Sequence, residues 1–188
     1  MIYDSATVYD ISMQPTLNAN SGIVDTDMVY YNKLSDVKRG NIVVIAVDDT
    51  MIIKRVVAVA GDRIRYTYED GVYRVYHNNM ILLEEYVKEE ITTEKLINSG
   101  NAVLYKDYDD VTGYNPFGVL KANQPDRFDE LGNYVVAEDE IFAMGDNRLH
   151  STDSKTHGGY KVDNVVGVVE MVISSKDDAV AKLFNFVF

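Results

Sequence analysis

The sequence predicts a mainly β fold whose core is a folded-over sheet or a barrel. Short runs rich in valine and isoleucine recur along the chain, as in Asn41 to Val47 and Met51 to Ala60. Polar turn sequences separate neighbouring runs, which is typical of β-hairpins. Of the 188 residues, 46% are hydrophobic, so a chain of this length can bury a sizeable core.

Strands are expected throughout the first half of the chain. Asp48-Asp49-Thr50 and Glu69-Asp70-Gly71 have the composition of hairpin turns. The sequence from Ile42 to Val47 is apolar at every position, which favours a strand buried on both faces. The expected strands are residues 24–31, 41–47, 51–60, 63–68 and 72–76.

The middle of the chain, residues 83–132, is acidic and lacks a sustained β pattern. We interpret it as an inserted variable lobe between two parts of a β-rich core, residues 1–82 and 133–188. Within the lobe, Glu84 to Ser99 are expected to form one helix, because acidic residues stand in its first turn and Gly100 follows it. After the lobe, strands are expected at residues 134–136, 140–144 and 164–173.

The composition excludes several classes of function. The net charge of −12 argues against binding to nucleic acid and against electrostatic docking on anionic lipid. The absence of cysteine rules out disulfides, thiolate zinc sites and a cysteine nucleophile. The histidines, His77, His150 and His157, are too scattered for a metal site. We therefore expect no metal and no cofactor.

Two polar residues in apolar surroundings predict an acyl-transfer site. Ser12 opens the segment Ser12-Met13-Gln14-Pro15-Thr16-Leu17, and Lys54 lies between Met51-Ile52-Ile53 and Val56-Val57. A serine hydroxyl needs a base, and a lysine can be that base when burial lowers its pKa. Taken singly, Ser12 would be an ordinary turn hydroxyl, and Lys54 would point outward from an edge strand.

Four segments, in order along the chain, resemble the sequence boxes of type I signal peptidases, which are membrane-anchored Ser–Lys endopeptidases. A single box would be weak evidence, whereas four in the same order are strong. The segments leave the middle lobe unaccounted for. They are Ser12 to Leu17, Lys38 to Val44, Lys54 to Asp62 and Gly145 to Ser154.

This resemblance implies a role for individual residues. Ser12 would attack the scissile carbonyl, and Lys54 would act as general base and then as general acid. Ser151 would form a hydrogen bond with the Lys54 amine and orient it, with Asp153 and Arg148 supporting that turn. The backbone N–H of Ser12 would contribute to the oxyanion hole.

The resemblance also implies how substrate is bound. Val8, Met13 and Ile53 match positions that line shallow S1 and S3 pockets for small side chains such as alanine. The substrate would add a strand along the segment that leads into Lys54. The implied function is removal of signal peptides from exported preproteins or pilins. The site would lie at the outer face of the cytoplasmic membrane, held there by an N-terminal anchor that is absent from this chain.

The surroundings of the Ser–Lys pair depart from the family pattern. Asp10 stands where the family usually has glycine or serine, and its negative charge would repel a developing oxyanion. Lys155 replaces an arginine that would pair with a carboxylate through two nitrogens. Asn41 replaces an aspartate, and Ala58 and Ala60 replace glycine and proline.

These departures leave an alternative function open. The chain could be a weakly active or non-catalytic member of the family, extracellular in a Gram-positive bacterium, that binds pilin segments and assists pilus assembly. A self-cleaving Ser–Lys repressor shares the dyad chemistry but would need a DNA-binding module before Ser12, and the acidic charge argues against one.

Overall fold

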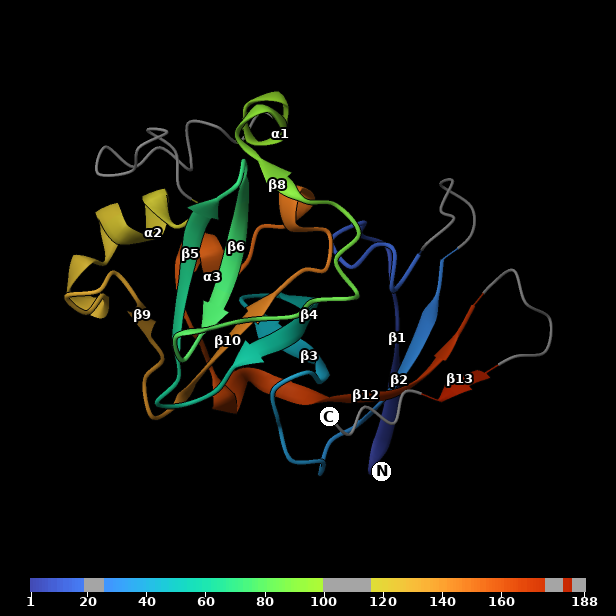
Figure 1. The fold of residues 1–188 in the computed structure, drawn as a ribbon. Coiled ribbons are helices and arrows are strands. Elements are labelled where there is room, and N and C mark those ends of the chain that lie inside the picture. Colours follow the sequence, from blue (N-terminus) through green and yellow to red (C-terminus); the bar gives the residue numbers. More distant parts are fainter. Residues whose placement is uncertain (19–25, 100–115, 175–180, 184–188) are drawn as a thin grey trace.

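The computed structural model describes residues 1–18, 26–99, 116–174 and 181–183. These residues form two antiparallel sheets that lie next to each other, with short helices around the smaller one (Figure 1). The predicted mainly β fold class is confirmed. The predicted boundaries of the inserted lobe stay a prediction. Strands that precede residues 83–132 and a strand that follows them belong to the same small sheet.

The larger sheet contains eight strands in the order β1-β2-β12-β3-β4-β10-β11, with β13 also paired to β12. Its centre is the β3–β4 hairpin, which places Val43 opposite Lys54. The strands are β1 (Tyr3–Thr7), β2 (Met28–Asn32), β3 (Ile42–Val47), β4 (Thr50–Ala58), β10 (Glu140–Met144), β11 (Tyr160–Lys161), β12 (Val165–Ile173) and β13 (Ala181–Leu183).

The smaller sheet contains five strands in the order β7-β6-β5-β9, with β8 also paired to β6. Its main hairpin turns at Asp70 and Gly71, whose φ angles of 51° and 89° are those of the turns that match strand twist. The expected hairpin at Glu69-Asp70-Gly71 is therefore present. The strands are β5 (Arg63–Glu69), β6 (Val72–His77), β7 (Met80–Ile81), β8 (Ile91–Thr92) and β9 (Tyr134–Val135).

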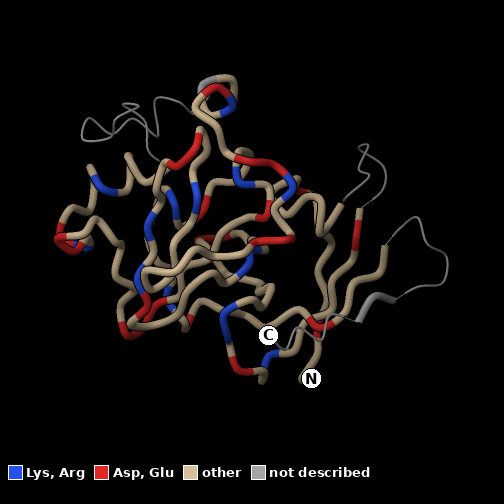
Figure 2. The backbone as a smooth tube through the Cα atoms, viewed as in Figure 1, with Lys and Arg blue, Asp and Glu red and all other residues tan. Residues whose placement is uncertain are grey.

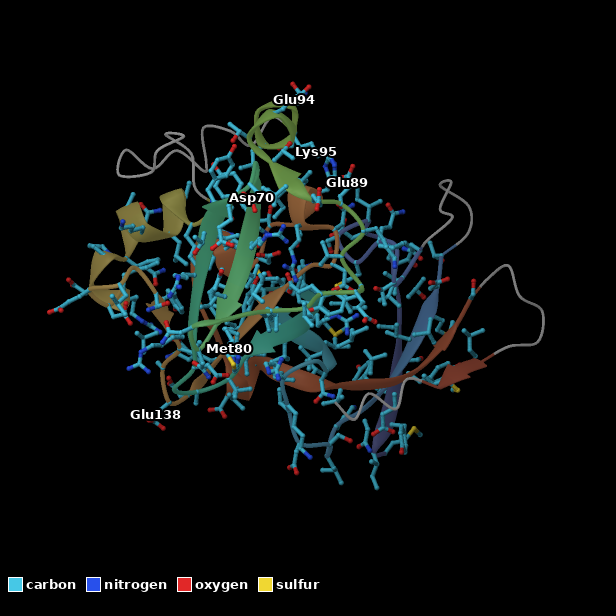
Figure 3. The ribbon with its side chains drawn as sticks, in the orientation of Figure 1. Asp70, Met80, Glu89, Glu94, Lys95 and Glu138 are labelled. Atoms are coloured by element: carbon cyan, nitrogen blue, oxygen red, sulfur yellow. The ribbon has the colours of Figure 1, made fainter. Side chains whose placement is uncertain are left out.

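The helix expected over Glu84 to Ser99 is wrong for its first half. Only Thr93–Asn98 is helical (α1), and the preceding residues Ile91–Thr92 form β8. The β-branched pair favours a strand, and Ile91 is 5% exposed and pairs with Tyr73 of β6. Figure 3 shows Glu94 and Lys95 of α1 at the outer surface close to Glu89, to which Lys95 forms an ion pair of 3.6 Å.

The remaining helical segments are short. Two of them, η3 and α3, lie directly before and directly after residues 151–153, which contain the predicted site residues Ser151 and Asp153. They are α2 (Gly118–Asn123), η2 (Pro125–Arg127), η3 (Arg148–His150), α3 (Ser154–His157) and η4 (Val162–Asn164).

Of the hydrophobic clusters among the described residues, one joins the two sheets and another supports the segment of Ser12. The first joins the two sheets, with Phe142 of β10 against aromatic rings of the smaller sheet and its helices. The second lies under the segment that contains Ser12 and includes Met13 and Leu17. Charged residues are sparse on β1, β2 and β12 and dense around the smaller sheet (Figure 2).

Candidate active site

Ser12 lies on a tight turn whose apolar neighbours anchor it in the core. The turn is closed by backbone hydrogen bonds from Gln14 N to Ile11 O and from Leu17 N to Met13 O, each 3.0 Å. Met13 and Leu17 are 1% and 0% exposed, so both ends of this turn are fixed by packing. Ser12 itself is 3% exposed.

Lys54 reaches Ser12 from the central strand β4. Its Nζ lies 2.7 Å from the Ser12 Oγ and 3.0 Å from the Ile53 carbonyl oxygen. Lys54 is 2% exposed, and within the described residues its amine forms no ion pair with a carboxylate. The structure thus brings together the two residues that the sequence singled out.

Burial lowers the pKa of Lys54, because the ammonium loses its hydration. The carboxylates of Asp153 and Asp10 act in the opposite direction, and the positive charge of Lys155 adds to the lowering. Burial is the largest of these effects. A lysine in this environment is neutral more readily than an exposed one, and a neutral amine can accept the proton of a neighbouring hydroxyl.

Asp153 organises the turn next to the dyad. It caps α3 by accepting a hydrogen bond from Lys155 N at 3.0 Å, and it accepts another from Gly145 N at 2.9 Å. The Lys155 ammonium lies 2.9 and 2.8 Å from its two carboxylate oxygens. A single ammonium therefore contacts both oxygens of Asp153, although it lacks the planar fork of the arginine that Lys155 replaces.

The predicted hydrogen bond between Ser151 and Lys54 is not among those of the described residues. The Ser151 hydroxyl donates to Asp153 Oδ2 at 2.5 Å instead. An ionised carboxylate is a stronger acceptor than any other group within reach, and this explains the orientation of the hydroxyl. Asp153 acts on Lys54 through its charge, which raises the Lys54 pKa.

Gly145 allows the turn at residues 145–148 to approach Ser12 closely. A Cβ atom at this position would overlap the Ser12 carbonyl oxygen and the Ser151 side chain. The next contact is a hydrogen bond from Asn147 N to Ser12 O at 2.9 Å. The backbone of Ser12 is therefore held by this turn as well as by its own packing.

Arg148 contacts the turn by donating from Nε to Gly145 O at 2.9 Å, and the supporting role that the resemblance implies for it stays a prediction. Its guanidinium pairs with both oxygens of Glu84 at 2.6 Å. Burial alone would lower the pKa of Arg148, but the Glu84 carboxylate, with smaller contributions from Tyr66 and Tyr86, more than offsets this, so that the pKa is raised. Nothing in the sequence near Glu84 indicates this pairing, and Glu84 was expected in the first turn of a helix.

A second ion pair between an arginine and a carboxylate was also not predicted from the sequence. Arg55, next to Lys54 in β4, binds both oxygens of Asp146 at 2.8 and 2.7 Å, and Thr16 Oγ1 donates to the same carboxylate at 2.5 Å. Arg55 and Asp146 both lie in segments that resemble the family boxes. Arg55 directly follows Lys54 and Asp146 directly follows Gly145, and these neighbours were the signal in the sequence that could have indicated the pair. The ion pair joins β4 to the turn that follows β10.

The predicted pocket residues Val8, Met13 and Ile53 belong to a single hydrophobic cluster. Val8 is 4% exposed, and Ile53 is partly buried beside Lys54. Their role in lining substrate pockets stays a prediction. Asp10 is exposed, and its Oδ1 accepts a hydrogen bond from Ile11 N at 2.6 Å.

Within the described residues, no group of three or more metal-ligating side chains could hold a metal ion. No helix in the described part of the chain is long and apolar enough to cross a membrane.

Known proteins match most of this chain. The family model "Signal peptidase, peptidase S26" matches residues 1–174. Signal peptidase I P of Bacillus subtilis subsp. natto is 30% identical over 179 residues, which cover 94% of this chain and 80% of that protein. Signal peptidase I of Pseudomonas aeruginosa is 28% identical over 199 residues, covering 93% of this chain and 66% of that protein.

Among solved structures, a signal peptidase I from Enterococcus faecalis V583 matches with a TM-score of 0.44 and 21% identity, covering 71% of this chain and 97% of the other. The match of the family model to residues 1–174, together with the relative at 30% identity, shows that the chain belongs to the signal peptidase, peptidase S26 family.

Proposed function

We propose that this chain is a serine endopeptidase that removes signal peptides from exported proteins, with Ser12 as nucleophile and Lys54 as general base. The observation that carries the proposal is the 2.7 Å distance between Lys54 Nζ and Ser12 Oγ, with both residues buried. A nucleophile and a base within hydrogen-bond reach, the base partly deprived of its charge by burial, form the minimal arrangement for this chemistry.

In the first half of the reaction, the neutral Lys54 amine takes the proton from Ser12 Oγ as that oxygen attacks the scissile carbonyl carbon. The tetrahedral intermediate collapses, the C–N bond breaks, and the Lys54 ammonium gives its proton to the leaving amine. This leaves the signal peptide as an ester on Ser12. In the second half, Lys54 accepts a proton from a water molecule that attacks the ester carbonyl carbon. The bond between that carbon and Ser12 Oγ then breaks, the Lys54 ammonium returns its proton to Ser12 Oγ, and the signal peptide leaves with a free carboxyl terminus.

The backbone N–H of Ser12 is proposed as one donor to the oxyanion, and Val8, Met13 and Ile53 as the walls that favour small substrate side chains. Asp10 sets a limit on this activity. It is an exposed carboxylate that acts on the Lys54 charge, and the same negative charge opposes an oxyanion formed at Ser12. We therefore propose weak or narrow activity on exported preproteins, at the outer face of the cytoplasmic membrane.

Asp10 also favours a second candidate function. A site whose oxyanion is poorly stabilised can still hold an extended peptide, and the chain would then bind pilin segments and assist pilus assembly without cutting them. The two functions differ in one property, since only the first needs the dyad.

The test is cleavage of signal-peptide and pilin-derived peptides by the parent chain, Ser12→Ala and Lys54→Ala. Ser5→Ala and Lys33→Ala, which change exposed residues of the same types, are the matched controls. We expect cleavage by the parent and both controls and none by the dyad variants. Equal cleavage by all five proteins would exclude the proposed chemistry, whereas tight binding without cleavage by the parent would favour the pilin-binding function.

A further inference from the structure

The segment that follows β7 places two side chains against the arginines that flank the dyad. The Glu84 carboxylate pairs with Arg148 through two contacts of 2.6 Å, and the two side chains are 11% and 1% exposed. The Tyr86 ring centre lies 4.0 Å from the Arg55 guanidinium carbon and 5.9 Å from that of Arg148. Both arginines are thus covered by one short piece of the region that the sequence resemblance leaves unaccounted for.

Each of these arginines holds the turn formed by residues 145–148. Arg148 Nε donates to the Gly145 carbonyl oxygen at 2.9 Å, and Arg55 binds the Asp146 carboxylate at 2.8 and 2.7 Å. Bidentate contacts of this kind fix direction as well as distance. The position of the turn therefore depends on where the two guanidinium groups are held.

The turn at residues 145–148 also holds the backbone of Ser12 and its neighbour. Asn147 donates from its backbone N to Ser12 O at 2.9 Å and from Nδ2 to Ile11 O at 3.2 Å. Thr16, on the same segment as Ser12, donates to Asp146. Hydrogen bonds thus join Glu84 to Arg148, Arg148 to Gly145 and Asn147 to Ser12, and the backbone of the turn connects Gly145 to Asn147.

We infer that Glu84, assisted by the Tyr86 ring, is a positioning residue that holds the turn at residues 145–148 in the geometry that presents Ser12 to Lys54. Without the carboxylate, Arg148 is a buried cation without its partner, and it must move or recruit water. Either change weakens its hold on the Gly145 carbonyl. The inference rests on the proposed function, and it adds a pair of residues outside the matching motifs to the site.

Glu84→Gln is the first test, because it removes the charge and keeps the size. We expect kcat to fall about tenfold to a hundredfold while KM changes less than about twofold, since a misplaced nucleophile slows the chemical step more than binding. Glu84→Asp, which keeps the charge, should recover part of kcat. Tyr86→Phe keeps the ring over Arg55 and should lose less than Tyr86→Leu.

Glu140→Gln is the control for removing the charge of a buried carboxylate that pairs with arginine. Glu140 is 5% exposed and pairs with the partly exposed Arg127 at 2.6 Å and with Lys161 at 3.1 Å, outside the path to Ser12. We expect it to lower thermal stability as Glu84→Gln does, but to keep the parent kcat. Equal kcat losses in Glu84→Gln and Glu140→Gln would reduce Glu84 to a structural role and overturn the inference. If Glu84→Gln does not fold, Tyr86→Leu takes its place in this comparison.

Amide hydrogen exchange tests the same path without any substrate. Protection of the Asn147 amide should drop about tenfold or more in Glu84→Gln, because that amide donates to Ser12 O, while amides of β2 and β12 keep their protection. Unchanged Asn147 protection would overturn the inference even if the parent cleaves. If the parent does not cleave any peptide, the proposed function fails, and this measurement still decides the positioning role.

Discussion

Two buried lysines, Lys155 and Lys54, are both influenced by Asp153 but differ in the groups that their amines contact. Lys155 is 1% exposed, and its ammonium contacts both Asp153 oxygens and the Ser151 carbonyl oxygen at 2.8 to 3.1 Å. Lys54 is 2% exposed, and its amine contacts a hydroxyl and a carbonyl oxygen. Burial lowers the pKa of both lysines, but Asp153 opposes this directly at Lys155 and only from a distance at Lys54.

This comparison shows that burial alone does not define a catalytic lysine. Burial works against the charge of Asp153, but Lys155, the Ser151 hydroxyl and the Gly145 N–H more than compensate, and the pKa of Asp153 is lowered. The Asp153–Lys155 pair is therefore a compensated structural unit. Lys54 forms no ion pair with a carboxylate among the described residues, so no direct contact of this kind opposes the effect of burial on its charge.

The largest expected effect on cleavage is that of Lys54→Met, which keeps the aliphatic stem of the side chain and removes the amine. Peptide cleavage should fall by about 10²–10⁴-fold, because a general base typically contributes that much. Stability should stay the same or rise, because the variant no longer buries an amine without a carboxylate partner. Initial rates and urea unfolding of the same preparations measure both. A clear loss of stability would mean that Lys54 is a structural cation.

Lys155→Met should show the reverse pattern in stability. Removing this ammonium leaves Asp153 buried without its counter-charge, and breaking such a pair costs about 3–5 kcal/mol. Urea unfolding should show this loss, and adding Asp153→Asn should restore part of it. If Lys155→Met and Lys54→Met unfold at the same urea concentration, the distinction between the two lysines is wrong.

The pH dependence of cleavage by the parent chain should report on Lys54, because its amine acts only when neutral. For this reason kcat/KM should rise with pH through the lowered Lys54 pKa and level off below the ordinary lysine value of 10.5. Below that pKa the slope should be about tenfold per pH unit for a single proton. Cleavage that keeps rising with the full slope up to pH 10.5 would show that burial does not lower this pKa.

The sequence predicted the part of the site that depends on local pattern. Ser12 and Lys54 lie in motifs whose order along the chain was diagnostic, and the apolar flanks of Lys54 indicated burial. The Val- and Ile-rich runs and the turn at Asp70 predicted the two main hairpins. In each case a short segment carries its own signal, either a run of apolar β-branched residues or turn residues that tolerate a positive φ angle.

The remainder depends on pairing between distant segments. Glu84 and Arg148 are 64 positions apart, and nothing near Glu84 distinguishes a buried partner of arginine from a surface residue of a helix. The Ser151 hydroxyl was expected to bind the Lys54 amine but donates to the Asp153 carboxylate, and the sequence does not distinguish between these two partners. β8 was missed because its β-branched pair gains its strand conformation from β6.

The smallest expected effect is at Asp10, where the two lysines differ again, since Asp10 raises the pKa of Lys54 and is not among the main influences on Lys155. Asp10→Asn removes that charge, so the rising limb of kcat/KM should move to lower pH, by less than about one unit. At neutral pH the variant should cleave a few times faster, both because more Lys54 is neutral and because an anion near the oxyanion is gone. Asp4→Asn, which changes another exposed aspartate near the N-terminus, should leave the rising limb of kcat/KM at the same pH.

The contrary outcome is a rising limb that moves to higher pH, or slower cleavage by Asp10→Asn. Either result would show that the Asp10 carboxylate assists the reaction, for instance by holding Ile11 N in the turn before Ser12.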